Sequence, residues 1–138
     1  MKIVLCHGTY DLLHPGHVKH FQDARALGDY LVVTLTADAF INKGPGRPIF
    51  NENERLAMIL SLACVNYAEI CHEKTGLSMI DKYQPHIYAK GSDYLTVDKH
   101  GSLEIERQRV ESYGGKLMLT PHSGYSSSAI IERIRGMK

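Results

Sequence analysis

The chain has 138 residues, a formal net charge of +1 at pH 7, and 43% hydrophobic and 22% charged residues. This composition is typical of a soluble globular protein, and the length suits one domain over residues 1–138. A charge so close to zero argues against a nucleic-acid binder and a polybasic membrane anchor, and no apolar run approaches the roughly 20 residues of a membrane span. The three cysteines contain no CxxC pair, which disfavours a disulfide framework and favours a reducing, cytoplasmic setting.

Apolar runs of strand length alternate with stretches of helical spacing along the chain. Strands are predicted at residues 2–6, 30–35, 67–71, 86–89 and 116–120. Helices are predicted at 18–27, from 51 onward, at 77–83, at 101–113 and from the serines at 126–128 onward. Asn51 is the expected N-cap of the second helix, and the last helix is expected to carry an apolar stripe at Ile130, Ile131 and Ile134. Residues 41–50 (INKGPGRPIF) contain two glycines and two prolines and are predicted to form a loop. Five alternations predict a single α/β domain with a Rossmann-like, doubly wound, five-stranded parallel sheet.

Polar segments follow four of the predicted strands. They are residues 7–17, 37–50, 90–94 and 121–128, and each is rich in Gly, Ser, Lys, Arg or His. Ligands of such sheets bind beyond the carboxyl ends of the strands, so we expect these segments to converge on one edge. Gly8 after the first strand would let a ligand approach the backbone closely. No GxGxxG motif follows it, which disfavours a nicotinamide dehydrogenase. Several anion-binding segments in a chain of modest net charge point to a nucleoside triphosphate.

His14 and His17 flank a Pro-Gly pair where the first helix is expected to begin. A helix N-terminus carries amide donors and partial positive charge, and two imidazoles there would donate to phosphate oxygens in a transition state. The simpler alternative is that such a histidine caps the helix or lies on the surface. A zinc site would need further ligands, and an HxxH pair at a helix start is not the usual arrangement of metal-binding histidines.

The other polar segments offer further candidates. Lys43 and Arg47 could close over a polyanion from their loop, Lys90 could bind phosphate, and Asp93 could hold a ribose hydroxyl or help to hold Mg²⁺. The simpler alternatives are a solvated loop for Lys43 and a turn with an Asx-type bond at residues 90–94. The serines at 126–128 offer hydroxyls and amides suited to phosphate, and an N-cap role would account for only one of them.

Arg55 is expected on the first turn of its helix, where a cation is mildly unfavourable against the helix dipole. That position hints at an anionic partner. The partner could be a substrate phosphate, although the neighbouring Glu52 or Glu54 could also satisfy the charge.

Four motifs in order resemble the HxGH superfamily of small nucleotidylyltransferases. The segment "GTYDLLHPGH" is similar to the first signature of that superfamily, and "YSSSAII" to the second, at the start of the last helix. Between them, "NKGPGRPIFNENER" and "YAKGSDY" look most like the adenylyltransferase domain of bifunctional heptose-phosphate (ADP-heptose) synthases. Glycerol-3-phosphate cytidylyltransferase is similar but matches the loop less well. Ser127-Ser128 replaces the usual Thr-Thr, and His122 stands where cytidylyltransferases often carry an arginine.

The resemblance implies transfer of a nucleoside monophosphate from a triphosphate, with ATP slightly favoured, to a phosphorylated sugar or polyol in nucleotide-sugar and lipopolysaccharide biosynthesis. Pyrophosphate is the other product, and Mg²⁺ would enter with the triphosphate. The implied catalytic residues are His14, His17 and Lys43. The implied nucleotide-binding residues are Gly8, Thr9, Tyr10, His14, His17, Lys90, Gly91, Asp93, Ser126, Ser127 and Ser128. The implied acceptor-binding residues are Asp11, Lys43 and Arg55.

Three alternatives remain at this point. One is a CTP-dependent cytidylyltransferase acting on glycerol phosphate or a similar small phosphate or phosphonate. Another is a nucleotide-binding domain without catalytic activity, and the third is a structural zinc protein. The expected partners are the nucleotide and the phosphorylated acceptor, with no nucleic acid or membrane. A separate sugar kinase would supply the acceptor, and the resemblance also allows a homodimer.

Overall fold

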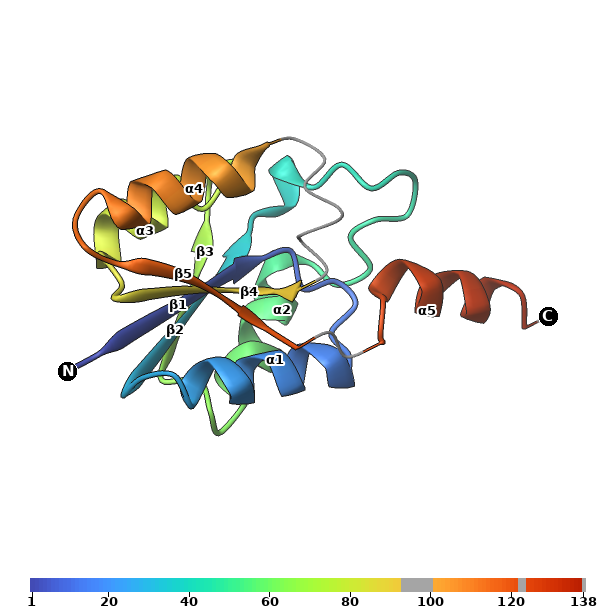
Figure 1. The fold of residues 1–138 in the computed structure, drawn as a ribbon. Coiled ribbons are helices and arrows are strands. Elements are labelled where there is room, and N and C mark those ends of the chain that lie inside the picture. The colour runs from blue at the N-terminus through green and yellow to red at the C-terminus, as the bar shows by residue number, and fades with distance from the viewer. Residues whose placement is uncertain (93–100, 122–123, 138) are drawn as a thin grey trace.

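The computed structural model describes residues 1–92, 101–121 and 124–137. Five parallel strands form one sheet in the order β3-β2-β1-β4-β5 (Figure 1). The strands are β1 (Ile3–Gly8), β2 (Tyr30–Thr36), β3 (Tyr67–Cys71), β4 (Ile87–Gly91) and β5 (Lys116–Thr120). The helices are α1 (Pro15–Arg25), α2 (Glu52–Leu60), α3 (Leu77–Tyr83), α4 (Ser102–Glu111) and α5 (Ser127–Arg135), with a short 3-10 helix, η1 (Asp38–Phe40), after β2. This arrangement confirms the predicted doubly wound α/β fold.

The central strand β1 marks the point where the strand order reverses. Leu5 lies opposite Val32 of β2 on one side and Tyr88 of β4 on the other. The chain builds β2 and β3 outward from one edge of β1 and then crosses over to place β4 on the other edge. In such sheets a crevice opens beyond the carboxyl ends of the two diverging strands. The ends of β1 and β4 therefore define where a ligand site is expected.

Two apolar layers hold the sheet between its helices. Helices α1 and α2 cover one face, and α3 and α4 cover the other (Figure 1). The side chains of β1 alternate between the two layers, as period-2 strand geometry requires. Val4 packs with Phe21 and Ile59 on the α1 and α2 side, whereas Leu5 packs with Ile80 on the other. The strand ends are thus fixed by packing on both faces.

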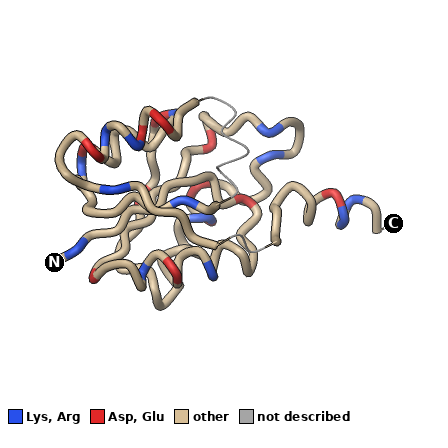
Figure 2. The backbone as a smooth tube through the Cα atoms, in the orientation of Figure 1, with Lys and Arg blue, Asp and Glu red and all other residues tan. Residues whose placement is uncertain are grey.

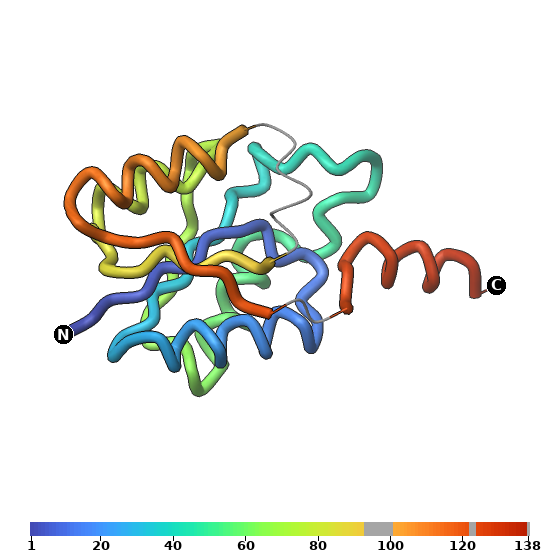
Figure 3. Tube along the Cα trace, in the orientation of Figure 1, coloured from blue at the N-terminus to red at the C-terminus, as the bar shows by residue number. Residues whose placement is uncertain are grey.

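Helix α5 lies beyond the carboxyl end of β5, to one side of these layers (Figure 3). The expected apolar stripe of this helix is only partly buried, because Ile131 is 6% exposed but Ile134 is 56% exposed. The middle of α5 is therefore buried against the domain, whereas the side chain of Ile134 near its end faces solvent. The N-terminus of the chain lies at the opposite end of the molecule.

Charged residues of both signs are interspersed along the chain, and many lie on the helices (Figure 2). On α4, Arg107 pairs with Glu104 and Glu111, and Arg109 pairs with Asp81. Within the described ranges, no helix is both long enough and apolar enough to cross a membrane.

Candidate active site

His14 is the N-cap of α1, and it forms a reciprocal capping box with His17. The Nδ1 atom of His14 accepts from the backbone N–H of Gly16 at 3.0 Å and of His17 at 3.3 Å. In return, Nδ1 of His17 accepts from the backbone N–H of His14 at 3.2 Å. The capping alternative considered for these histidines is therefore present, and it uses only one nitrogen of each ring.

The capping box also fixes the protonation of both rings. Because each Nδ1 accepts a hydrogen bond, each neutral imidazole carries its proton on Nε2, where it can donate. The rings of His14 and His17 stack with centroids 3.8 Å apart, and Tyr10 packs edge-on to His17 at 5.3 Å. Burial lowers the pKa of His14, and burial together with the charges of His14, His20 and Lys43 lowers the pKa of His17 to about 3. Both rings are neutral donors near pH 7.

His7 adds a third buried imidazole at the end of β1. Its Nδ1 lies 2.9 Å from Oγ1 of Thr34, and its backbone carbonyl accepts from Nζ of Lys90 at 2.5 Å. Burial and the nearby charge of Lys90 lower the pKa of His7 to about 3. Lys90 and His7 thus place one cation and one neutral ring where β1 and β4 diverge.

The depressed pKa of His7 makes stability depend on pH. An unfolded chain protonates this histidine near pH 6.5, whereas the folded chain does so only near pH 3. Between these values the unfolded state binds more protons, so stability is lost as the pH falls. We expect His7 to account for about 2 kcal/mol of lost unfolding free energy between pH 7 and pH 5. Urea denaturation at both pH values should show a smaller loss in His7→Asn, and an equal loss would contradict this assignment.

A cleft with a volume of about 250 Å³ opens at this edge of the sheet. It is lined by the segment after β1, the start of α1, the end of β4, the end of β5 and the start of α5. The lining residues are His7, Gly8, Thr9, Tyr10, Asp11, His14, Gly16, His17, His20, Lys43, Lys90, Gly91, Thr120, Pro121, Tyr125, Ser126, Ser127 and Ser128. The structure therefore brings twelve of the fourteen predicted site residues together, and Arg55 and Asp93 are the other two.

Two helix N-termini reach this cleft. Besides α1, α5 begins there with Ser126 as its N-cap, whose Oγ accepts from the backbone N–H of Ala129 at 3.3 Å. Ser127 donates from its Oγ to the carbonyl of Leu12 at 2.7 Å, which ties α5 to the segment after β1. The positive ends of two helices and the side chain of Lys43 give the cleft an electropositive character suited to an anion.

Gly8 and Tyr10 shape the floor of the cleft. A Cβ atom at Gly8 would lie 2.8 Å from Cζ of Tyr10, so only glycine leaves room for this ring. Tyr10 is 7% exposed, and its ring also meets Phe21 edge-on with a centroid distance of 4.9 Å. The glycine predicted to allow a close backbone approach therefore also allows the ring that supports His17.

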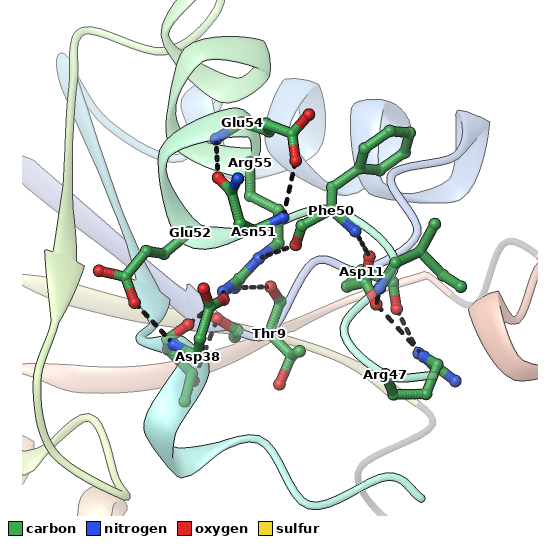
Figure 4. A network of polar contacts seen from close by, with 12 residues as sticks. Thr9, Asp11, Asp38, Arg47, Phe50, Asn51, Glu52, Glu54 and Arg55 are labelled. Carbon is green, nitrogen blue, oxygen red and sulfur yellow. Dashed lines mark hydrogen bonds and ion pairs between the residues drawn. The ribbon is translucent and has the colours of Figure 1, made fainter. Parts of the chain in front are cut away.

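Asp11 lines the cleft, but its carboxylate is engaged by the loop at residues 41–50 (Figure 4). Oδ2 accepts from the backbone N–H of Ile49 at 2.7 Å, and Oδ1 accepts from that of Phe50 at 3.0 Å. Arg47 donates from Nε to Oδ2 at 3.2 Å and from Nη2 to the carbonyl of Asp11 at 2.5 Å. These contacts argue against the predicted contact of Asp11 with an acceptor, because both carboxylate oxygens already hold the loop. They also argue against the prediction that Arg47 closes over a polyanion, because its Nε and Nη2 already donate to Asp11.

Arg55 is not among the residues that line the cleft, and it is 0% exposed; Figure 4 shows its contacts. Its Nη2 pairs with Oδ1 of Asp38 at 2.6 Å, and Nη1 donates to the carbonyls of Thr9 at 2.8 Å and Thr36 at 2.7 Å. Its Nε donates to the carbonyl of Phe50 at 3.0 Å. This placement corrects the predicted contact with acceptor or triphosphate, because every guanidinium nitrogen already serves a protein oxygen.

The anionic partner inferred for Arg55 is therefore Asp38 of η1. Within the part of the chain that the structure describes, neither of the two glutamates considered in its place pairs with the guanidinium. Glu52 instead accepts from the backbone N–H of Asp38 at 2.8 Å, and Glu54 completes a capping box with Asn51 at the start of α2. The predicted Asn51 cap is confirmed, and it fixes the start of α2, where Arg55 lies next to the first turn.

His20 is a cleft residue that the motif comparison missed. It lies one turn beyond His17 on α1, and its Nδ1 is 2.6 Å from Oγ1 of Thr120 at the end of β5. The repeated three-residue spacing of His14, His17 and His20 was a signal available in the sequence. Asp93 and His122 lie outside the described residues. Among the residues that are described, no group of three or more His, Cys, Asp or Glu side chains is placed to hold a metal ion.

Comparison with known families identifies the class to which this fold and cleft belong. The model of the cytidylyltransferase-like family matches residues 5–133, and the chain belongs to that family. Similar proteins include the "Bifunctional protein HldE" of Pelobacter propionicus, 44% identical over 136 residues, and that of Helicobacter pylori, 41% identical over 136 residues. These matches cover 96% and 97% of this chain but only 27% and 28% of the relatives. The chain thus spans about a quarter of the length of these curated relatives.

Solved structures show the same fold. A lipopolysaccharide core biosynthesis protein from Thermoplasma volcanium is 30% identical, with a TM-score of 0.71, and the match covers 91% of this chain and 99% of that one. Pantoate-beta-alanine ligase from Francisella tularensis is 14% identical with a TM-score of 0.59, over 87% of this chain and 59% of that one. The second likeness concerns the fold alone.

Proposed function

We propose that this chain is a nucleotidyltransferase that moves a nucleoside monophosphate from a triphosphate to a phosphorylated acceptor. The observation that carries the proposal is the capping box, which makes His14 and His17 neutral rings with Nε2–H donors at one cleft. Lys43, Lys90 and the N-termini of α1 and α5 supply positive charge to the same cleft. Such fixed donors stabilise the charge that develops on a reacting phosphate.

In the reaction that we propose, an oxygen of the acceptor phosphate attacks the α-phosphorus of the triphosphate. The new phosphorus–oxygen bond forms as the bond from the α-phosphorus to the α,β-bridging oxygen breaks, and pyrophosphate leaves with that oxygen. The acceptor phosphate is already an anion, so the step needs no general base. His14 and His17 would donate to the α-phosphate oxygens, and Lys43 would neutralise charge on the phosphates. The protein's main contributions are position and electrostatics.

Mg²⁺ fits this proposal as part of the incoming nucleotide. Asp11 is the carboxylate among the described lining residues, and its oxygens are engaged by Arg47 and by two backbone N–H groups. A Mg²⁺ ion would therefore be held by the triphosphate oxygens and water, as is common for nucleotide-bound magnesium. The serines at 126–128, Thr9 and Gly91 would border the same nucleotide.

We propose ATP and a sugar phosphate as the substrates, for nucleotide-sugar formation. Support comes from the 41–44% identity to proteins named HldE and from the 30% identity to a protein of lipopolysaccharide core biosynthesis. The family name and the cleft are also compatible with CTP and a polyol phosphate. We also propose that a separate sugar kinase supplies the acceptor, that the chain forms a homodimer, and that it acts in a reducing, cytoplasmic setting.

Pyrophosphate release tests the proposal and separates the two nucleotides. The unmodified protein should release pyrophosphate from ATP only when a sugar phosphate is present, and the rate should be higher with ATP than with CTP. A panel of sugar 1-phosphates and glycerol 3-phosphate identifies the class of acceptor. A higher rate with CTP and glycerol phosphate would favour the second pair of substrates. No release with any pair, together with nucleotide binding, would favour a binding domain without catalytic activity.

A further inference from the structure

The short loop that carries Lys43 ends at the buried pair of Asp11 and Arg47. We name these two side chains, with their bonds to the backbone of residues 49 and 50, the Asp11–Arg47 clamp. The side chains of Arg47 and Asp11 are 6% and 0% exposed, so water does not weaken their pairing. The clamp joins segments 36 residues apart in sequence, and it is the point at which the loop meets the segment after β1.

Little chain separates Lys43 from this clamp. Between Lys43 and Arg47 the backbone passes through Gly44 at φ +97° and Gly46 at φ +76°, conformations that side-chain-bearing residues rarely adopt. Lys43 is exposed and lines the cleft, whereas Arg47 is not among the lining residues and its side chain is buried. The place of Lys43 is therefore set by a tight turn whose far end is fixed by Arg47.

A second contact supports the same turn from α5. Arg135 donates from Nη2 to the carbonyl of Pro45 at 3.4 Å, and Ser127 at the other end of α5 donates to Leu12. Helix α5 thus bridges the tip of the loop and the segment after β1. The positive charge of Lys43 also contributes to the depressed pKa of His17, so the two side chains interact electrostatically.

We infer that Asp11 and Arg47 are positioning residues, which hold Lys43 at the cleft beside His17. Arg47 does not itself need to touch a substrate, because its Nε and Nη2 are directed to Asp11. Its effect on transfer is exerted through Lys43. The expected effect on nucleotidyl transfer rests on the function proposed above. That the clamp holds the loop in place does not depend on that function.

Limited proteolysis tests the mechanical part without any substrate. Trypsin can cut after the exposed Lys43, whereas the Arg47–Pro48 bond resists it because proline follows. Without the clamp the loop opens more often, so Arg47→Met should speed the cut after Lys43 by about tenfold relative to the cut after Lys19. Arg109→Met, at an exposed ion pair on α4, is the matched control and should change neither rate. An unchanged rate in Arg47→Met would overturn the clamp.

A double-mutant cycle tests the coupling to Lys43 in transfer. We expect Arg47→Met and Lys43→Met each to lower kcat/KM by about tenfold or more, and the double variant to be no worse than Lys43→Met alone. Arg47→Lys should recover part of the rate, because an ammonium can pair with the Asp11 carboxylate but cannot also reach its carbonyl in the same fork. If Arg47→Met does not fold, Arg47→Lys replaces it in the cycle.

The outcomes separate this inference from the proposed function. If the two losses multiply in the double variant, Arg47 acts independently of Lys43 and the coupling is wrong. If the unmodified protein transfers no nucleotide, the proposed function is wrong, and the trypsin rates still decide whether the clamp holds the loop. A tenfold coupling corresponds to about 1.4 kcal/mol of interaction between the two positions.

Discussion

Replacing His14 with asparagine should lower kcat for nucleotidyl transfer by about two to three orders of magnitude and leave the melting temperature nearly unchanged. Asparagine is one of the best N-cap residues, so its side-chain oxygen can accept the N–H groups that Nδ1 of His14 accepts now. It cannot reproduce an Nε2–H donor on the far side of an imidazole ring. The variant therefore separates the capping role of His14 from its proposed role on phosphate.

His14→Ala is the matched control for that separation. Alanine loses both the cap and the donor, so it should cost about 1 kcal/mol of stability in addition to a similar loss of rate. Steady-state kinetics and thermal unfolding of the two variants measure both quantities. Full activity in His14→Asn would show that His14 is only a helix cap, as the simpler alternative holds.

Replacing Arg55 with methionine should lower the free energy of unfolding by about 3 to 5 kcal/mol. Methionine fills much of the same volume but donates no hydrogen bond. It would leave three backbone carbonyls, one of them in a fully buried contact, without the donor they have now, and Asp38 without its cation. For a chain of this size the expected fall in melting temperature is about 10 to 15 °C.

Arg109→Met is the control for Arg55→Met, because it removes another arginine ion pair whose side chains are 42% and 54% exposed. Exposed pairs contribute about 0 to 1 kcal/mol, so this variant should melt near the unmodified protein. Differential scanning calorimetry measures both variants. An unchanged melting temperature with a large increase in KM would contradict the structural role of Arg55 and restore the predicted contact with substrate.

The order of strands and helices was predictable because burial on both faces leaves a strong apolar pattern. The strands at 67–71 and 116–120 and the helix at 77–83 have the predicted bounds. The first helix was predicted from 18, where its apolar spacing starts, but α1 begins at Pro15, because the His14 cap and the proline determine that end. For α5, helical spacing predicted an apolar stripe, but spacing alone does not tell which part of the stripe is covered.

The cleft was predictable as a set of segments, because parallel strands bring their carboxyl ends to one edge. The roles of individual side chains were less predictable. Asp11 and Arg55 belong to the same sequence motifs as cleft residues. Their partners at residues 38 and 47–50, however, become their neighbours only in the folded chain. His20 was missed because it falls outside the recognised signature. Its partner Thr120 is the last residue of β5, a strand that was correctly predicted.

We expect this cleft to direct attack on the α-phosphorus of a nucleoside triphosphate. Following that atom tests the claim most directly: ATP labelled at the α-phosphate is incubated with Mg²⁺ and a sugar phosphate, with the unmodified protein and with His14→Asn. We predict that the label enters a nucleoside diphosphate sugar in equal amount to released pyrophosphate, and that His14→Asn suppresses both. Label that stays in ATP, or leaves as ADP with inorganic phosphate, would contradict the account.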